Sequence, residues 1–294
     1  MAVERRDRFG IGWRPELASG IAAHLHRIDV IEVIAENLFH ASRAERQNFA
    51  ALAREVPLTL HGVSLGLASA APVDRRALDR MARLVGEVEP ESWSEHLASV
   101  RAGGWEIGHL AAAPRSAATI DGLAANVRRA HQATGRAPAL ENIATLLEPP
   151  GSDRAEGAWV RDALAATGTS LLLDLHNLHA NATNFGFTPG SFLASIPANR
   201  ISQVHIAGGR VVAAKSGERR ILDDHLHAVP DEVFALLEVV GEIAAGPVDV
   251  VLERDGSFPG IAELLLELDR AREALARGRA RRSLVPEGAS FVRA

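Results

Sequence analysis

The chain has 294 residues, a length that fits either two ordinary domains or one large α/β barrel. Hydrophobic residues make up 47% of it and charged residues 23%, and the net charge of −5 argues against a protein that holds nucleic acid on a broad basic surface. The absence of cysteine excludes disulfides, thiolate metal sites, iron–sulfur clusters and thiol nucleophiles.

Short apolar segments alternate with amphipathic segments along the whole chain. The apolar segments predict eight strands, at Arg8–Gly12, Asp29–Ala35, Leu58–Gly62, Ser92–Leu97, Ala137–Ile143, Ser170–Leu175, Ile201–Ile206 and Val248–Glu253. The amphipathic segments predict helices at Glu16–His26, Ala41–Glu55, Asp74–Gly86, Ile120–Thr134, Asp153–Thr167, Ser191–Ala194, Pro230–Ala244 and Gly260–Arg277. Apolar strands that alternate with helices are typical of a parallel sheet. No GxGxxG or Walker loop follows the first strand, so we expect a single-domain (β/α)8 TIM-type barrel.

The two ends of the chain carry little further signal. No charged-then-apolar leader opens the sequence and no apolar run reaches ~18 residues, so we expect a cytoplasmic location and no membrane span. We expect the barrel to span residues 1–268 and residues 269–294 to form an arginine-rich helix end and tail. Because no aromatic residues alternate with the arginines between Arg270 and Arg282, we interpret them as a solvated surface.

Side chains that can bind metals follow almost every predicted strand. Active sites of such barrels lie where the strands end, so these side chains are expected at one rim. In chain order they are Glu36, Asn37, His61, Glu95, His96, Glu141, Asn142, Asp174, His176, Asn177, His179, His205, Asp223, Asp224, His225, His227, Glu253 and Asp255. Carboxylates gathered there would repel one another, and a divalent cation would reverse that cost. The set exceeds what one octahedral ion can bind, so we expect two or three metal ions held by imidazole and carboxylate.

Five other histidines are interpreted as structural or surface residues. His24, His26, His40 and His131 lie in or next to predicted helices, and His109 lies in a predicted loop.

Nine segments, in this order, resemble one known family. They are GIGWRPEL, IEVIAENLF, LHGVSLGL, WSEHLA, LENIATLL, LLLDLHN, ISQVHIAGG, ILDDHLHAV and VLERDG, and they extend from Phe9 to about Pro259. The ordered set resembles the multinuclear non-heme iron-dependent oxidative enzymes (MNIO, DUF692), which include methanobactin-biosynthesis enzymes. The resemblance implies a xylose-isomerase-like barrel with two or three irons of mixed Fe(II)/Fe(III) state. It also implies oxidation by O2 of a ribosomally made precursor peptide, usually at cysteine, with a partner protein that recognises the peptide leader.

The resemblance also assigns residues at the matching motif positions. It implies metal ligands at His61, His96, Glu141, Asp174, His176, Asn177, His205, Asp223, His225 and Glu253. Among them His61, His96, Glu141, Asp174 and His205 are expected to be catalytic, with Glu141 as a bridging carboxylate. Glu36, Glu95, Asn142 and Asp255 are expected to orient the ligating side chains.

The chain departs from the family pattern in three places. His176 replaces the first Asn of the D-x-N-N motif, which could add a nitrogen ligand or change how a third iron is held. Glu141-Asn142 continues as Ile143-Ala144-Thr145-Leu146 instead of polar–polar–aromatic, and the chain has no tyrosine. These departures leave the substrate and the product open.

The loop from Gly208 to Leu222 is rich in basic residues. Arg210, Lys215, Arg219 and Arg220 are expected to bind an acidic or C-terminal part of the peptide, with a solvated mobile loop as the alternative.

Two other functions stay open at this point. One is a divalent-metal-dependent sugar isomerase or phosphodiesterase of the xylose-isomerase-like barrel type, although the only lysine, Lys215, falls in a loop and isomerases usually keep one near the metals. The other is a non-catalytic metal-dependent scaffold, which would be expected to have lost ligands.

Overall fold

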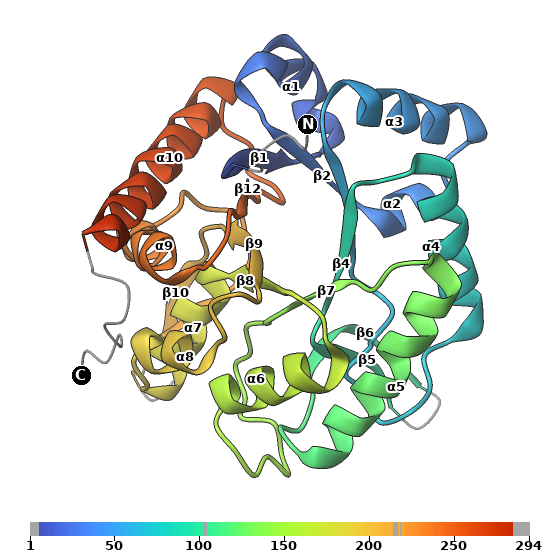
Figure 1. Cartoon of the computed structure of the whole chain (residues 1–294), viewed down its shortest axis with the longest axis vertical. Helices are drawn as coiled ribbons and strands as arrows, with labels where there is room; N and C mark the ends of the chain where they lie inside the picture. Colours follow the sequence, from blue (N-terminus) through green and yellow to red (C-terminus); the bar gives the residue numbers. More distant parts are fainter. Residues whose placement is uncertain (1–5, 103–104, 214–216, 218, 285–294) are drawn as a thin grey trace.

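Eight parallel strands close into a barrel in the computed structural model, which describes residues 6–102, 105–213, 217 and 219–284 (Figure 1). Around the barrel the strand order is β1, β12, β9, β8, β7, β4, β3, β2, so each strand pairs with its neighbours in sequence among the barrel strands. Their bounds are β1 (Arg8–Gly12), β2 (Val30–Ile34), β3 (Leu58–Gly62), β4 (Ser92–His96), β7 (Ala139–Glu141), β8 (Leu171–Asp174), β9 (Ile201–Ile206) and β12 (Asp249–Leu252). Each expected strand matches an observed one to within two residues, and the expected fold is confirmed.

Helices surround the barrel and separate its strands (Figure 1). Their bounds are α1 (Ala18–Ala23), α2 (Ala35–Phe39), α3 (Arg43–Glu55), α4 (Arg75–Val88), α5 (Ala117–Thr134), α6 (Glu156–Thr167), α7 (Leu175–Phe185), α8 (Pro189–Ser195), α9 (Asp231–Ile243) and α10 (Ile261–Ser283), with short 3-10 turns η1 (Pro15–Leu17) and η2 (Leu25–Arg27). The helix expected at Glu16–His26 is thus broken into three short pieces. Within the described residues, no helix combines the length and hydrophobicity that crossing a bilayer requires.

Helix α7 begins directly at the end of β8, where the sequence indicated only polar residues after a strand. Asp174 is its N-cap, and Asp174 Oδ1 accepts a hydrogen bond from the backbone N–H of Asn177 at 2.7 Å. One carboxylate oxygen of Asp174 therefore starts the helix. The other oxygen, Oδ2, has no hydrogen-bond partner in the described part of the chain and is left for the barrel interior.

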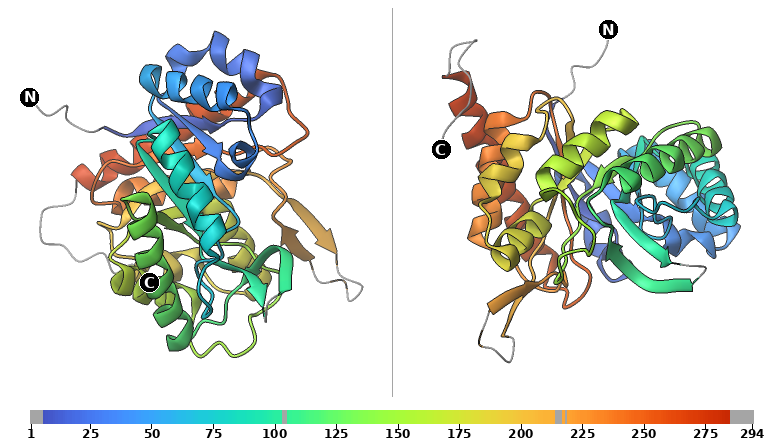
Figure 2. Two further views of the ribbon diagram at one scale, coloured as in Figure 1. Left: turned by 90° about the vertical axis from the view of Figure 1, so that its right-hand side faces the viewer. Right: turned by 90° about the horizontal axis from the view of Figure 1, so that it is seen from below.

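Two β-hairpins project from the same end of the barrel (Figure 2). One consists of β5 (Ala98–Ala102) and β6 (Trp105–Ala112), and the other of β10 (Arg210–Ala213) and β11 (Arg219–Leu222). The expectation of loops at His109 and between Gly208 and Leu222 is therefore wrong. Strands β6 and β10 are largely exposed, and they lack the continuous apolar runs that marked the buried barrel strands. Lys215 lies outside the described residues.

Helix α10 continues past residue 268 and packs along α9. Arg272 donates hydrogen bonds to Asp29 and to the carbonyl of Arg27, and Arg279 donates to Asp7 and to the carbonyl of Ala244. The interpretation of this arginine-rich stretch as simply solvated is wrong for these two side chains. The division at residues 268 and 269 stays a prediction, and residues 285–294 lie outside the described part.

A glycine pair lets α9 and α10 approach closely, and it leads to a stability prediction. A Cβ atom at Gly278 would lie 1.9 Å from the carbonyl oxygen of Glu238 and 2.8 Å from the Cα of Gly241. Gly278→Ala is expected to lower the free energy of unfolding by about 2 kcal/mol, because the helices must separate. Gly86→Ala, where a Cβ would meet nothing within 4 Å, should instead raise it by about 0.5–1 kcal/mol. Denaturant titration of both variants checks this, and a Gly278→Ala variant as stable as Gly86→Ala would contradict it.

Candidate metal centre

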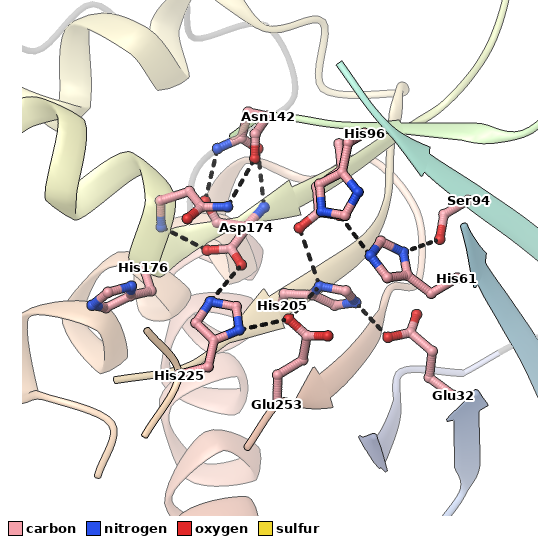
Figure 3. A network of polar contacts seen from close by, with 12 residues as sticks. Glu32, His61, Ser94, His96, Asn142, Asp174, His176, His205, His225 and Glu253 are labelled. Atoms are coloured by element: carbon pink, nitrogen blue, oxygen red, sulfur yellow. Dashed lines mark hydrogen bonds and ion pairs between the residues drawn. The ribbon is translucent and has the colours of Figure 1, made fainter. Parts of the chain in front are cut away.

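The ends of β3, β4 and β7 bring His61, His96 and Glu141 together in what we call the inner group. Figure 3 labels its two histidines. His61 Nε2 and His96 Nε2 both lie 3.3 Å from Glu141 Oε2. All three side chains are buried, and one potential ligand atom from each lies within 4.8 Å of the others. Neighbouring parallel strands present their last residues side by side, which explains why residues so distant in sequence converge here.

Glu141 also belongs to a second set, the central group, with Asp174, His205 and Glu253. His205 Nδ1 lies 3.3 Å from Glu141 Oε1 and 3.1 Å from Glu253 Oε2. On its other side, His205 Nε2 lies 3.0 Å from Glu32 Oε1. Glu141 is thus common to both groups, as a bridging carboxylate would be.

The outer group consists of His176, Asp223 and His225 and is less buried than the other two. Asp223 Oδ1 lies 2.7 Å from His176 Nδ1 and 2.8 Å from His225 Nε2. The His176 ring leaves no room beside it, because a Cβ at Gly209 would lie 2.6 Å from its Cε1 atom. The backbone of His225 has a left-handed φ of 51°, and its carbonyl accepts a hydrogen bond from the Asp255 N–H at 2.9 Å.

Many polar atoms at this centre are buried without a hydrogen-bond partner in the described residues. They are Glu32 Oε2, Glu141 Oε2, Asp174 Oδ2, Asn177 Oδ1, both ring nitrogens of His205 and His225 Nε2. Each such atom costs roughly 1–3 kcal/mol when it stays unsatisfied. Their concentration at one place, together with a donor set of imidazoles and carboxylates without sulfur, fits divalent or trivalent metal ions.

Two carboxyls of the centre have strongly raised pKa values. Burial raises the pKa of Glu141 to about 7, with Glu253 and Glu32 adding to the effect while His205 opposes it. Burial likewise raises the pKa of Asp174 to about 7, against the opposing charge of His225. Glu253 behaves differently: although burial opposes its ionisation, His205 and His225 lower its pKa well below the usual value.

The histidines divide into two classes. Burial lowers the pKa of His96 to about 4 and that of His61 well below its usual value, so both rings are neutral and have a lone pair for a metal. Burial also disfavours charge on His205 and His225. The carboxylates of Glu253, Glu32 and Glu141 outweigh this effect for His205, and the nearby carboxylates of Asp223, Asp255 and Glu253 outweigh it for His225. Both pKa values are therefore raised well above normal. Without a metal, these two rings are held as cations by carboxylates.

Asn142 links the ends of the two strands that carry Glu141 and Asp174. Its side-chain Oδ1 accepts from the backbone N–H of Asp174 at 3.0 Å, and its Nδ2 donates to the carbonyl of Asp174 at 2.9 Å. Its own carbonyl accepts from Asn177 Nδ2 at 3.0 Å. Asn142 therefore acts as a clamp between β7 and β8, the strands that end in Glu141 and Asp174.

The other three residues expected to orient ligands have different surroundings. Glu95 is fully buried, and its carboxylate accepts from the backbone N–H groups of His96 and Leu65 at 3.0 and 3.1 Å. Asp255 Oδ2 lies 3.5 Å from His225 Nδ1. Glu36 accepts from the backbone N–H groups of Val63 and Ser64, so it anchors the loop after His61, with no contact to a ligating side chain in the described part.

The centre includes three residues that the sequence interpretation missed. Glu32 faces His205 from the middle of β2, and Ser94 Oγ lies 2.8 Å from His61 Nδ1. Arg14 is buried, and it forms an ion pair with Asp255 and lies 4.0 Å from Glu253. A carboxylate inside the apolar strand VIEVI was the signal for Glu32, since only a paired charge persists there.

A comparison with known protein families identifies the family of this chain. Residues 8–276 match the model of a family described as RiPP precursor modification enzyme MbnB/TglH/ChrH, where RiPP denotes a ribosomally made and then modified peptide. The chain belongs to this family. The expected resemblance is thereby confirmed over nearly the whole chain.

Relatives with the label UPF0276 protein are similar over most of the chain. A protein of Caulobacter vibrioides is 32% identical over 280 residues, which cover 95% of this chain and 98% of the relative. One from Rhizorhabdus wittichii is 36% identical, covering 93% and 96%. One from Streptomyces avermitilis is 38% identical over 90% of this chain, and the match spans only 54% of that longer relative.

Solved structures show the same fold at low sequence identity. The D-psicose 3-epimerase of Clostridium cellulolyticum H10 superposes with a TM-score of 0.58 at 13% identity, covering 93% of this chain and 98% of the epimerase. A xylose isomerase domain protein of Alicyclobacillus acidocaldarius has a TM-score of 0.57 at 20% identity, covering 92% and 99%. These likenesses concern the fold alone and confirm a xylose-isomerase-like TIM barrel.

An open cavity of about 670 Å³ leads from the hairpin end of the barrel to side chains of the three groups. His61, His96, Asn177, His225 and Glu253 belong to its lining. The rest of the wall comes largely from uncharged residues of β6, of the loop after β7 and of β11, with Arg14, Glu148 and three aspartates among them.

The predicted substrate-binding arginines lie on the second hairpin, away from the metal-binding side chains. Arg210 is exposed and approaches Asp224 to 3.4 Å. Arg219 is also exposed, whereas Arg220 donates a hydrogen bond at 2.6 Å to the carbonyl of Leu146. Arg220 thus joins β11 to the loop after β7 across the side of the cavity.

Proposed function

We propose that this chain is an iron- and O2-dependent oxidoreductase that modifies a precursor peptide at cysteine residues. Membership of a precursor-modification family supports the peptide substrate. The observation that carries the proposal further is the arrangement of three adjoining His–carboxylate groups, two of which share Glu141. A shared carboxylate and overlapping groups suit two or three metal ions better than one.

The proposed ligands are those of the three groups, with Asn177 as an additional oxygen ligand. Bound iron would supply charge stabilisation for the substrate and the redox capacity to use O2. His96 Nδ1 lies 3.2 Å from the carbonyl of Gly62, so this nitrogen holds the proton and Nε2 keeps its lone pair toward Glu141. Ser94 Oγ lies 2.8 Å from His61 Nδ1 and orients the ring, so that Nε2 faces the same carboxylate.

Charge balance and rigidity are supplied by residues around these ligands. Arg14 offsets part of the negative charge of Asp255 and Glu253, and burial of its guanidinium keeps that charge close. Through its hydrogen bonds to the backbone of Asp174, Asn142 fixes the end of β8 relative to the end of β7, and so fixes the position of Asp174 relative to Glu141. Glu32 Oε1 lies against His205 Nε2, on the side away from Glu141, and supplies an opposite charge there.

The direct test is the metal content of protein purified without added metal, with iron oxidation states from Mössbauer spectroscopy. Two or three irons per chain, with coupled Fe(III), are expected. Stoichiometric zinc or manganese with negligible iron, even after anaerobic reconstitution with Fe(II), would contradict the proposal and favour a hydrolase or isomerase of the same fold.

A second expected result concerns the arginines of the β10–β11 hairpin. If Arg219 and Arg220 bind an acidic or C-terminal part of the precursor, Arg219→Ala with Arg220→Ala should weaken peptide binding by about tenfold or more. Iron content should stay unchanged, because neither side chain belongs to the three groups. Binding is measured by titration of a labelled precursor encoded near the enzyme. Equal affinity in the variant would show that the hairpin arginines do not bind the peptide.

The proposed partner is a protein that recognises the peptide leader. Only the family membership supports this partner. The peptide-binding titration should therefore be carried out both with and without the product of a neighbouring gene.

A further inference from the structure

Most of the exposed large apolar side chains lie on segments that contribute to the cavity wall. In the described residues the exposed ones are Trp105, Ile107, Leu146, Leu147, Val211, Leu226, Leu266 and Leu284. Leu146 and Leu147 line the cavity themselves, and Trp105 and Ile107 lie on β6, whose later residues line it. Trp105 is 80% exposed and Leu147 77% exposed. Exposing large apolar side chains to water is unfavourable, so their presence on the segments that line one opening indicates a binding surface.

Strand β6 borders this opening with its backbone. His109, Leu110, Ala111 and Ala112 all line the cavity although they are consecutive in one strand. Because successive side chains of a strand point to opposite faces, four consecutive lining residues mean that the strand lies edge-on to the cavity. Within the described residues β6 pairs with β5 alone, so its other edge is open.

The loop after β7 forms another, largely apolar part of the cavity wall and is held in place. Leu146 and Leu147 line the cavity on this loop, followed by Glu148, Pro149 and Pro150. Thr145 N–H donates to Asn181 Oδ1 at 2.9 Å, and the carbonyl of Leu146 accepts from Arg220. The mouth therefore has an open strand edge on one side and a tethered apolar loop on another, with His61 and His96 in the same cavity.

We propose that an extended segment of the precursor peptide adds as a strand to the open edge of β6 and packs uncharged side chains against Leu146 and Leu147. This proposal rests on the peptide substrate of the proposed function and names how that peptide is held. An open strand edge offers backbone N–H and C=O groups, which another backbone in extended form satisfies independently of its side chains. The apolar wall then selects peptides that have small or apolar residues beside the one that is modified.

The test uses the full-length, metal-free protein and a defined probe. The probe is the capped hexapeptide acetyl-Ala-Val-Cys-Ala-Val-Ala-amide at millimolar concentration, and the measurement is amide hydrogen exchange by mass spectrometry. We expect slower exchange in residues 105–112. A peptide with the same side chains but alternate N-methylated amides should give no slowing, since it cannot pair as a strand.

A matched pair of variants tests the apolar wall. Leu147→Asp should weaken binding of the probe by about tenfold, because a charge replaces an exposed apolar contact. Leu266→Asp, at a 63% exposed position on α10, should leave it unchanged. Unchanged exchange in residues 105–112, equal slowing with the methylated peptide, or normal binding by Leu147→Asp would each overturn the proposal. Because no metal takes part, these outcomes are independent of whether the centre holds iron.

Discussion

Replacing Glu141 by Gln is expected to leave no more than one iron bound per chain and to abolish turnover. Glu141 is the carboxylate common to the inner and central groups, so one substitution removes an anionic ligand from both. Residues that merely orient ligands change metal affinity by about 10–100-fold, and loss of a shared ligand should exceed that. Elemental analysis and mass spectrometry of the peptide product measure both effects.

Glu156→Gln is the matched control. Burial raises the pKa of Glu156 to about 7, as for Glu141, and this side chain is also buried, beside Arg115 and Asn181. It lies in none of the three groups. Glu156→Gln should therefore keep its iron, and a loss equal to that of Glu141→Gln would mean that iron depends on general packing and not on the shared ligand.

In the metal-free protein, Glu141→Gln should not lower stability, although it removes a proposed metal ligand. The folded-state pKa of Glu141 is raised, so the folded chain holds this proton more tightly than the unfolded chain does, and stability falls as pH rises from about 4.5 through about 7. Glutamine has no ionisable carboxyl group, so it does not lose stability in this way as the pH rises. Metal-free Glu141→Gln should thus be at least as stable as the metal-free parent at pH 8, in thermal or denaturant unfolding.

Metal affinity should fall steeply with acidity below pH 7. Glu141 and Asp174 both have pKa values of about 7 in the metal-free chain, so each carries a proton below that pH. A metal ion that binds both carboxylates must displace these two protons, in addition to the proton on His205 of the same group. Each displaced proton lowers the affinity by about tenfold per pH unit. We expect the two carboxyls to contribute a loss of about thirtyfold between pH 7 and pH 6, which approaches a hundredfold per pH unit at lower pH as their protonation becomes complete.

Competition with a chelator of known affinity, at several pH values, measures this dependence. Asp174→Asn should reduce the slope by one proton while weakening binding overall. A slope near zero below pH 7 would show that neither carboxyl releases a proton to the metal.

Much of the fold was predictable from local pattern. The apolar segments of β3 and β8 are short, bounded by polar residues and followed by amphipathic helices, and these signals depend on neighbours in sequence. The strand ends His61, His96, Glu141 and Asp174 followed from the same pattern, because a parallel barrel brings all strand ends to one rim. Their roles as ligands stay predictions until metal is measured.

The hairpins and helix α7 were not predictable in the same way. β6 and β10 are exposed and stand outside the barrel, so no buried apolar run marks them. The sequence marked Asp174 as a candidate ligand, and the structure shows that its Oδ1 caps α7 while its Oδ2 has no hydrogen-bond partner in the described residues.

The sequence by itself determined the eight strand–helix units, the family and the supply of imidazole and carboxylate at one rim. The tertiary structure alone decided which of these side chains meet: Glu141 shared by two groups, Glu32 facing His205, and Arg14 buried beside Asp255. The physical reason is that strand periodicity and helix caps act over a few residues, whereas these contacts join residues far apart in the chain. Only closure of the barrel sets how far the end of each strand lies from the next.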